Sequence, residues 1–179
     1  QKALNLVNEI KSNRHFEINS VFTKERWEIY GEYAMFFAGE KSDHDISLVN
    51  YFPNYSKDKI GFNLQIIILQ IFILVRDGRE DTLFNHIENL RYYEIRQISK
   101  SDNRRAQYFM RLLRIVTKQS LNYEKCKKQG NKYANLLKKF PEKDQPYAEI
   151  EIMPYETLWK HMLTMLSKKS VDKSEVEFA

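Results

Sequence analysis

The sequence is poor in the residues that shape or staple non-helical folds. It has one cysteine, Cys126, so no disulfide can form within the chain, and we expect a reducing compartment such as the cytoplasm. Its 179 residues include 5 glycines and 4 prolines, which is few for the many tight turns of a β-sandwich or barrel. The glycines do not cluster, so no glycine-rich loop is present to hold a phosphate.

The chain also lacks a long hydrophobic run. Its most apolar stretch, residues 62–75 (FNLQIIILQIFILV), is shorter than the roughly 20 residues that span a bilayer. We therefore interpret it as a buried core helix and expect no membrane partner. Gln65 and Gln70 interrupt this stretch, and buried glutamines need hydrogen-bond partners. They either tie the helix to a neighbour or line a polar ligand pocket.

Metal-binding and cofactor motifs are missing as well. None of the four histidines lies three or four residues from another, which is the spacing that brings two ligands together on a helix. The best local cluster, Asp43-His44-Asp45, stands at the start of a predicted helix, where acidic residues cap and face water. We predict no metal, no cofactor and no enzymatic activity. The histidines are His15, His44, His86 and His161.

Cys126 is the remaining candidate nucleophile. The lysines next to it, at positions 125, 127 and 128, would lower the pKa of its thiol and favour the thiolate. No histidine lies nearby in the sequence to act as its base. We therefore favour an inert, half-buried thiol over a catalytic one.

Apolar residues recur at helical spacing along nearly the whole chain. Thr23 is the predicted N-cap of a helix whose apolar face holds Trp27, Tyr30, Ala34 and Phe37, and Gly39 is its predicted C-terminal stop. Residues 147–152 alternate like a strand but have no second strand to pair with, so we interpret them as an extended connection. The predicted helices begin at residue 2 and then cover 24–38, 45–52, 57–76, 80–99, 101–118, 122–139 and 154–166.

This pattern predicts an all-α fold of about eight helices. Short links between helices favour either stacked antiparallel helix pairs, as in an α-α superhelix, or an irregular helical bundle. We expect one helical-repeat domain over residues 1–167, followed by a polar, flexible tail over 168–179. The first residue is Gln1 and not methionine, so we expect a module of a longer protein.

The segment around Trp27 resembles the tetratricopeptide repeat. That family has the pattern W-x2-L-G-x2-Y in its first helix, and here Trp27, Tyr30, Gly31 and Ala34 stand at those four positions. The similarity covers about a dozen residues, and the helix pairs along the chain are spaced by nearer 45 residues than 34. The resemblance implies a tetratricopeptide-like superhelix that acts as a protein-binding scaffold, and it implies no catalytic residue.

Charge is distributed unevenly along the chain. Residues 99–143 contain 13 lysines and arginines against 3 acidic residues, whereas residues 1–98 contain 12 against 14 and residues 144–179 contain 4 against 7. Helical spacing places the basic residues of the middle segment in one stripe on each of two helices. A positive surface of this kind would attract acidic protein, phosphate or anionic lipid. The predicted partner- or anion-binding residues are Arg104, Arg105, Arg111, Arg114, Lys118, Lys125, Lys128, Lys132 and Lys139.

Two interpretations of this basic segment stay open. Lysine and arginine favour helices, so the stripes could be no more than solvated faces. Alternatively, they form a binding surface, and Tyr108, Tyr123 and Tyr133 either stack on bases there or lie at the edge of the core. Our main hypothesis for the whole chain is a non-enzymatic scaffold that binds a protein partner. The alternative is a nucleic-acid-binding module that uses residues 99–143.

Overall fold

The chain is helical throughout the part that the computed structural model describes. The described residues are 1–41, 62–93, 103–141 and 151–177, and they form seven α-helices and one 3-10 turn, without a strand. The predicted all-α fold is therefore confirmed. The predicted helix 45–52, the cluster Asp43-His44-Asp45 and residues 147–150 lie outside the described residues.

The chain divides into two compact units, residues 1–55 and 56–179, where the sequence predicted a single domain over 1–167. The last helix continues to Glu177, so residues 168–177 of the predicted tail are helical. That segment has few apolar residues to reveal a period, but it contains lysine and glutamate, which favour helix without any packing.

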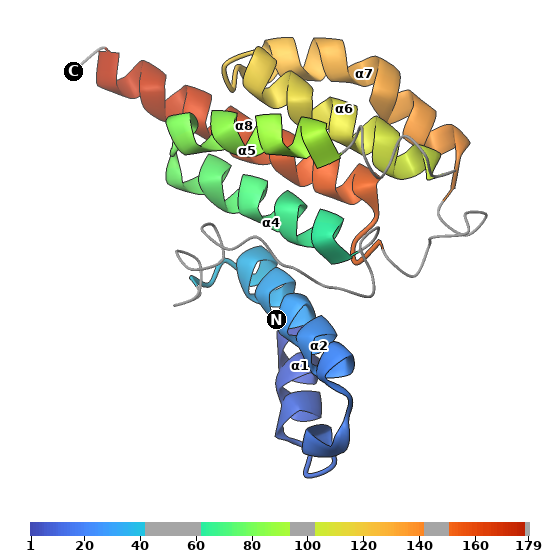
Figure 1. Cartoon of the computed structure of the whole chain (residues 1–179). Helices are drawn as coiled ribbons and strands as arrows, with labels where there is room; N and C mark the ends of the chain where they lie inside the picture. The colour runs from blue at the N-terminus through green and yellow to red at the C-terminus, as the bar shows by residue number, and fades with distance from the viewer. Residues whose placement is uncertain (42–61, 94–102, 142–150, 178–179) are drawn as a thin grey trace. The chain divides into compact units, whose positions relative to one another are not determined.

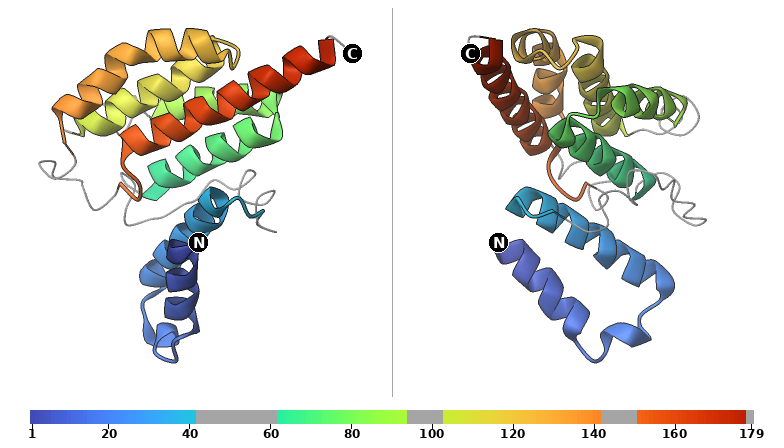
Figure 2. Two further views of the ribbon diagram at one scale, coloured as in Figure 1. Left: turned by 180° about the vertical axis from the view of Figure 1, so that it is seen from behind. Right: turned by 90° about the vertical axis from the view of Figure 1, so that its left-hand side faces the viewer.

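The first unit contains two antiparallel helices, α1 (Lys2–Ser12) and α2 (Val21–Ala38), joined through a short 3-10 turn, η1 (Phe16–Ile18) (Figures 1 and 2). Gly31 of α2 faces Val7 of α1 and has room for a β-carbon, which would lie 3.5 Å from the valine side chain. Lys11 and Glu28 form an ion pair of 2.6 Å between the same two helices. Helix α1 thus packs along the face of α2 that holds Glu28 and Gly31.

The ends of α2 follow capping chemistry. Its N-cap is Ser20 and not Thr23, because the Ser20 hydroxyl accepts a hydrogen bond from the backbone N–H of Thr23. Gly39 ends the helix in the left-handed conformation, with φ of 82°, as predicted. In a serine-x-x-threonine segment, either residue can cap a helix, and here the first one does.

The face of α2 that is most buried is not the predicted one. Trp27, Tyr30, Ala34 and Phe37 are half-buried, whereas Ile29 and Tyr33 are buried. Helix α2 carries apolar residues around most of its circumference, so the period of its sequence does not select one face.

The second unit packs five helices, and successive helices run in opposite directions (Figure 1). Each of α4 to α7 contacts the next helix in sequence, α8 contacts α4 as well as α7, and α6 also contacts α8. Figure 2 shows α8 lying along the unit between α4 and α7. The helices are α4 (Phe62–Asp77), α5 (Glu80–Tyr93), α6 (Arg104–Lys118), α7 (Tyr123–Lys139) and α8 (Tyr155–Glu177).

Helix α4 is the core helix predicted from its apolar sequence, and every side chain from 64 to 75 is buried. Gln65 is fully buried, and its side-chain amide donates a hydrogen bond of 3.3 Å to the Tyr155 hydroxyl of α8. This contact ties α4 to a neighbouring helix, which is one of the two roles that the sequence left open. Among the described helices, none combines the length and hydrophobicity that crossing a membrane requires.

Short links place α4 beside α5 and α6 beside α7. Gly78 takes a left-handed conformation in the first link, where the Asp77-Gly78 pair forms a tight turn. Asn103 and Asn122 cap α6 and α7 by accepting hydrogen bonds from the backbone N–H groups of residues 106 and 125. The basic residues of α6 and α7 therefore belong to two antiparallel, adjacent helices.

Candidate functional site

Eight of the nine basic residues predicted to bind a partner or an anion are exposed to solvent. They project from the faces of α6 and α7 that do not contribute to the core. On α6 they are Arg104, Arg111, Arg114 and Lys118, and on α7 they are Lys125, Lys128, Lys132 and Lys139.

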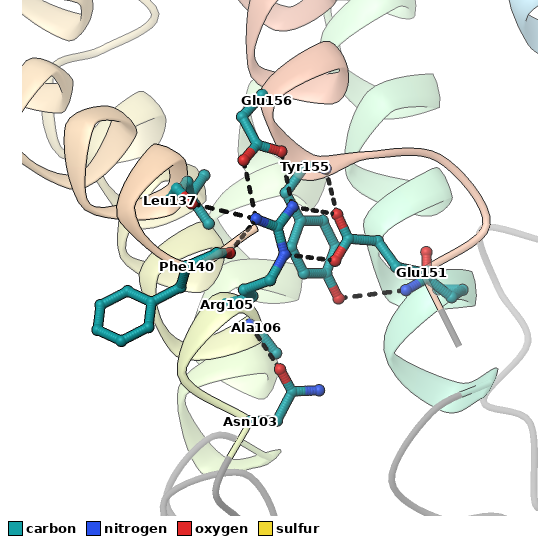
Figure 3. A network of polar contacts seen from close by, with 9 residues as sticks. Asn103, Arg105, Ala106, Leu137, Phe140, Glu151, Tyr155 and Glu156 are labelled. Carbon is teal, nitrogen blue, oxygen red and sulfur yellow. Dashed lines mark hydrogen bonds and ion pairs between the residues drawn. The ribbon is translucent and has the colours of Figure 1, made fainter. Parts of the chain in front are cut away.

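The ninth residue, Arg105, lies in the interior with 1% of its surface exposed, so its guanidinium cannot reach a partner. Glu151 accepts hydrogen bonds from its Nε (2.9 Å) and one Nη (2.6 Å), and Glu156 accepts from both Nη atoms (2.6 and 2.8 Å). The carbonyl oxygens of Leu137 and Phe140 also accept from it, at 3.1 and 2.6 Å (Figure 3). Every N–H group of the guanidinium thus points at an oxygen acceptor.

We call Arg105, Glu151 and Glu156 the arginine clamp. Burial disfavours the charged form of Arg105, but its hydrogen bonds to the two carboxylates outweigh burial and raise its pKa. Burial also acts to raise the pKa of Glu156, but the hydrogen bond from Arg105, a backbone hydrogen bond and the charges of Arg105 and Lys138 together lower it. The clamp joins the start of α6 to the end of α7 and the start of α8, and we assign it to structure.

Tyr133 connects the basic stripes of α6 and α7. The guanidinium of Arg111 lies 5.5 Å from the centre of the Tyr133 ring, and the ammonium of Lys132 lies 5.8 Å from it. Cations at this range are attracted to the electron-rich face of an aromatic ring. Cations from both helices therefore gather at one half-buried tyrosine.

Beside Tyr133 the surface is hollowed into a cleft of about 520 Å³, which we call the α5–α6 groove. One side carries three of the predicted basic residues of α6, spaced by about one helical turn. The apolar part of the lining includes Phe84, whose surface is 47% exposed. The lining residues are Phe84, Ile87 and Glu88 of α5, Arg111, Arg114, Ile115, Thr117 and Lys118 of α6, and Tyr133 of α7.

The charges of the groove are only partly balanced. Within the part of the chain that the structure describes, neither Arg111 nor Lys118 forms an ion pair with an acidic side chain. Glu88, on the opposite side, is the acidic residue in the lining. Its Oε2 lies 3.7 Å from Nη1 of Arg91 in the same helix. The α6 side thus keeps a positive field that faces the apolar surface of α5.

A smaller cleft of about 320 Å³ lies between α7 and α8, and none of the nine predicted residues lines it. Its lining includes Glu156 of the arginine clamp and Trp159. The basic residues predicted from the sequence are therefore associated with the larger groove.

The lysines next to Cys126 do not lower the pKa of its thiol as the sequence predicts, whereas the burial of the thiol agrees with the inert role favoured above. The lysines beside it are exposed, whereas its own side chain is fully buried, and burial raises the pKa of the thiol to about 11. Its Sγ lies 3.9 and 4.0 Å from the carbonyl oxygens of Ile115 and Val116. In the described residues, no three histidine, cysteine or acidic side chains lie close enough to hold a metal ion.

Comparison with protein-family models, curated proteins and solved structures finds no match to this chain.

The apolar half of the groove is what the sequence did not reveal. Ile87 and Phe84 both fit the apolar period of α5, and no local signal distinguishes the exposed phenylalanine from the buried isoleucine. For Tyr133 the sequence predicts only a place at the edge of the core or a stacking role. The residues meet because α5, α6 and α7 pack side by side.

Proposed function

We propose that this chain is a non-enzymatic helical module that binds a protein partner in the α5–α6 groove. The observation that carries the proposal is the mixed lining of the groove, in which exposed cations stand beside an exposed phenylalanine and a half-buried tyrosine. Arginine, tyrosine and phenylalanine are enriched in protein–protein interfaces because they combine large contact area with directed polar contacts. The resemblance to tetratricopeptide repeats implies the same class of function.

The proposal is tested by selecting ligands for the full-length chain from a library of displayed random peptides. The matched selection uses the double variant Arg111→Glu and Lys118→Glu, since both residues line the groove and neither is buried. We expect peptides that are enriched by the wild type and lost with the variant. Failure to enrich any peptide, or enrichment that the variant retains in full, would contradict the proposal.

Nucleic-acid binding is the second candidate, and the basic surface of α7 favours it. Lys125, Lys128, Lys132 and Lys139 are exposed, and none of them forms an ion pair with a described acidic residue. Such a surface binds phosphate backbones with an affinity that falls steeply as salt rises. Retention on a DNA column that is lost in the Lys125→Glu and Lys132→Glu double variant would support this candidate. No retention of the wild type at low salt would exclude it.

A further inference from the structure

We propose that the natural occupant of the α5–α6 groove is an acidic amphipathic helix of a partner protein. This inference rests on the function proposed above. The partner helix would direct a row of carboxylates at the cations of α6 and a row of apolar residues at Phe84 and Ile87 of α5. The argument combines the spacing of the cations, the polarity of the groove and the position of Glu88.

The cations of α6 are spaced to match the turns of another helix. Arg111, Arg114 and Lys118 stand at positions i, i+3 and i+7, so they span two turns, or about 10 Å. Asp or Glu at positions i, i+3 or i+4, and i+7 of a partner helix has the same spacing. Carboxylates two turns apart on the partner helix could then face Arg111 and Lys118 without bending either helix.

The groove is polarised across its width. The cations come from α6, whereas Phe84 and Ile87 come from α5, and the Arg111 guanidinium is already held over the Tyr133 ring. A ligand that fills the groove needs acidic and apolar atoms in two parallel rows. An amphipathic helix presents such rows on adjacent faces.

Glu88 disfavours a uniformly anionic occupant. Its exposed carboxylate lines the groove opposite the cations, where a phosphate backbone would place further negative charge. A partner helix avoids this repulsion when the residue that faces α5 is neutral or basic. Glu88 thus favours an acidic helix over a nucleic acid, although Arg91 partly compensates its charge and both ligands are attracted to α6.

The test measures binding of the full-length chain to synthetic peptides by fluorescence anisotropy at about 0.15 M salt. The probe is a helical peptide of about 18 residues, long enough to form a partly stable helix, with glutamates at i, i+4 and i+7 and leucines on the adjoining face. Its isomer has the same composition, but its glutamates are dispersed around the helix. We expect the isomer to bind at least about tenfold more weakly.

The matched protein variants carry the same change in charge at different places. Arg111→Glu with Lys118→Glu reverses the groove, and Lys125→Glu with Lys128→Glu reverses an exposed part of α7 that is not in its lining. We expect the groove variant to weaken binding of the acidic helix by about tenfold or more and the α7 variant by about threefold or less. Circular dichroism would show that both variants stay helical.

Equal binding of the two peptide isomers, or equal losses in the two protein variants, would overturn the inference because charge alone would then explain binding. The inference would also be overturned if a thymidine oligonucleotide of equal charge displaced the acidic helix and bound the groove with equal affinity. The selection could instead yield displayed peptides whose binding requires Arg111 and Lys118 but whose sequences lack an acidic stripe. That result would support the proposed function and refute this inference alone. Absence of both displayed and acidic peptide ligands would refute both.

Discussion

Gly130 lies in the middle of α7, at a point where three helices meet. A β-carbon added there would lie 2.5 Å from Cζ2 of Trp159 on α8 and 3.1 Å from a methyl group of Leu112 on α6. The 2.5 Å separation is far inside van der Waals contact, the 3.1 Å separation is also tight, and both side chains are buried. Glycine at this position lets the indole ring lie directly against the backbone of α7.

Replacement Gly130→Ala should therefore destabilise the second unit. Alanine favours helix over glycine by about 1 kcal/mol, but overpacking a tight core costs about 1–3 kcal/mol, so steric repulsion should dominate. Gly31→Ala is the matched control, because its β-carbon would make an ordinary contact of 3.5 Å with Val7. Urea unfolding followed by circular dichroism should show a loss of stability for the first variant and none for the second.

The thiol of Cys126 should be unreactive in the folded protein. It is fully buried, and its pKa of about 11 keeps it protonated at neutral pH. Reaction with a chromogenic disulfide reagent should be at least about 100-fold slower than after unfolding in guanidinium, since attack requires an exposed thiolate. Rapid labelling of the native chain would contradict the buried position of this residue.

Single residues were also where the sequence was least informative. Arg104 and Arg105 are adjacent and chemically identical, yet one is exposed and the other is buried between two carboxylates. The acidic partners of Arg105 stand 46 and 51 residues away, beyond any local pattern. Likewise, neighbouring lysines suggested a lowered pKa for Cys126, because a sequence shows which charges are near but not which side chains are desolvated.

The arginine clamp holds the ends of three helices together, and its loss should be costly. Replacement Arg105→Ala would remove the cation that faces the buried carboxylate of Glu151 and the donor to the Phe140 carbonyl, although the backbone N–H of Tyr155 would still donate to Glu151. Breaking a buried ion pair in this way costs about 3–5 kcal/mol. Arg104→Ala, which removes an exposed cation 5.5 Å from the Phe140 ring, should change stability by about 0.5 kcal/mol. Chemical unfolding of both variants would measure the difference.

The clamp also predicts how stability depends on pH. Because the pKa of Glu156 is lowered in the folded chain, its contribution is complete above its unfolded pKa of about 4.3. That contribution is lost as the pH falls through the lower folded value. Glu156→Gln removes the titrating group, so its unfolding free energy should fall less steeply on acidification below about pH 4. Identical pH profiles for the two proteins would show that Glu156 does not titrate as described.

Helices were the level at which prediction from sequence succeeded best. The basic stripe that helical spacing predicts on α6 is exposed, and the apolar residues on its other face, Ala106, Phe109, Met110, Leu113 and Val116, are all buried. The start of α2 was shifted because two neighbouring residues can both cap a helix. The end of α8 was underestimated because polar helix formers continue it without an apolar face.

At the scale of the whole molecule, the second unit should fold without the first. Residues 56–179 form a compact unit whose core includes the buried residues 64–75 of α4, and its five helices contact one another. A unit of this size can bury enough apolar surface to be stable alone. Produced separately, it should melt cooperatively by circular dichroism and bind the acidic helix as the full chain does. A non-cooperative melt would show that residues 1–55 are needed to complete its core.

The division into two units was not visible in the sequence. Helical periodicity continues on both sides of the boundary at residue 55, and no linker rich in glycine, serine or proline marks it. The groove also emerges only at this scale. The basic stripe of α6 could be predicted from spacing, but its apolar counterpart comes from helices whose adjacency depends on the packing of the whole unit.

The two tryptophans of the chain, Trp27 and Trp159, fall one in each unit. Trp27 is half-buried in α2, whereas Trp159 of α8 is buried and packs against Gly130 of α7. Replacing either one by phenylalanine leaves a single tryptophan, and its emission, excited at wavelengths that the tyrosines do not absorb, reports on one half of the protein. The chain therefore carries its own optical reporters, with which unfolding of each half can be followed separately and without an added dye.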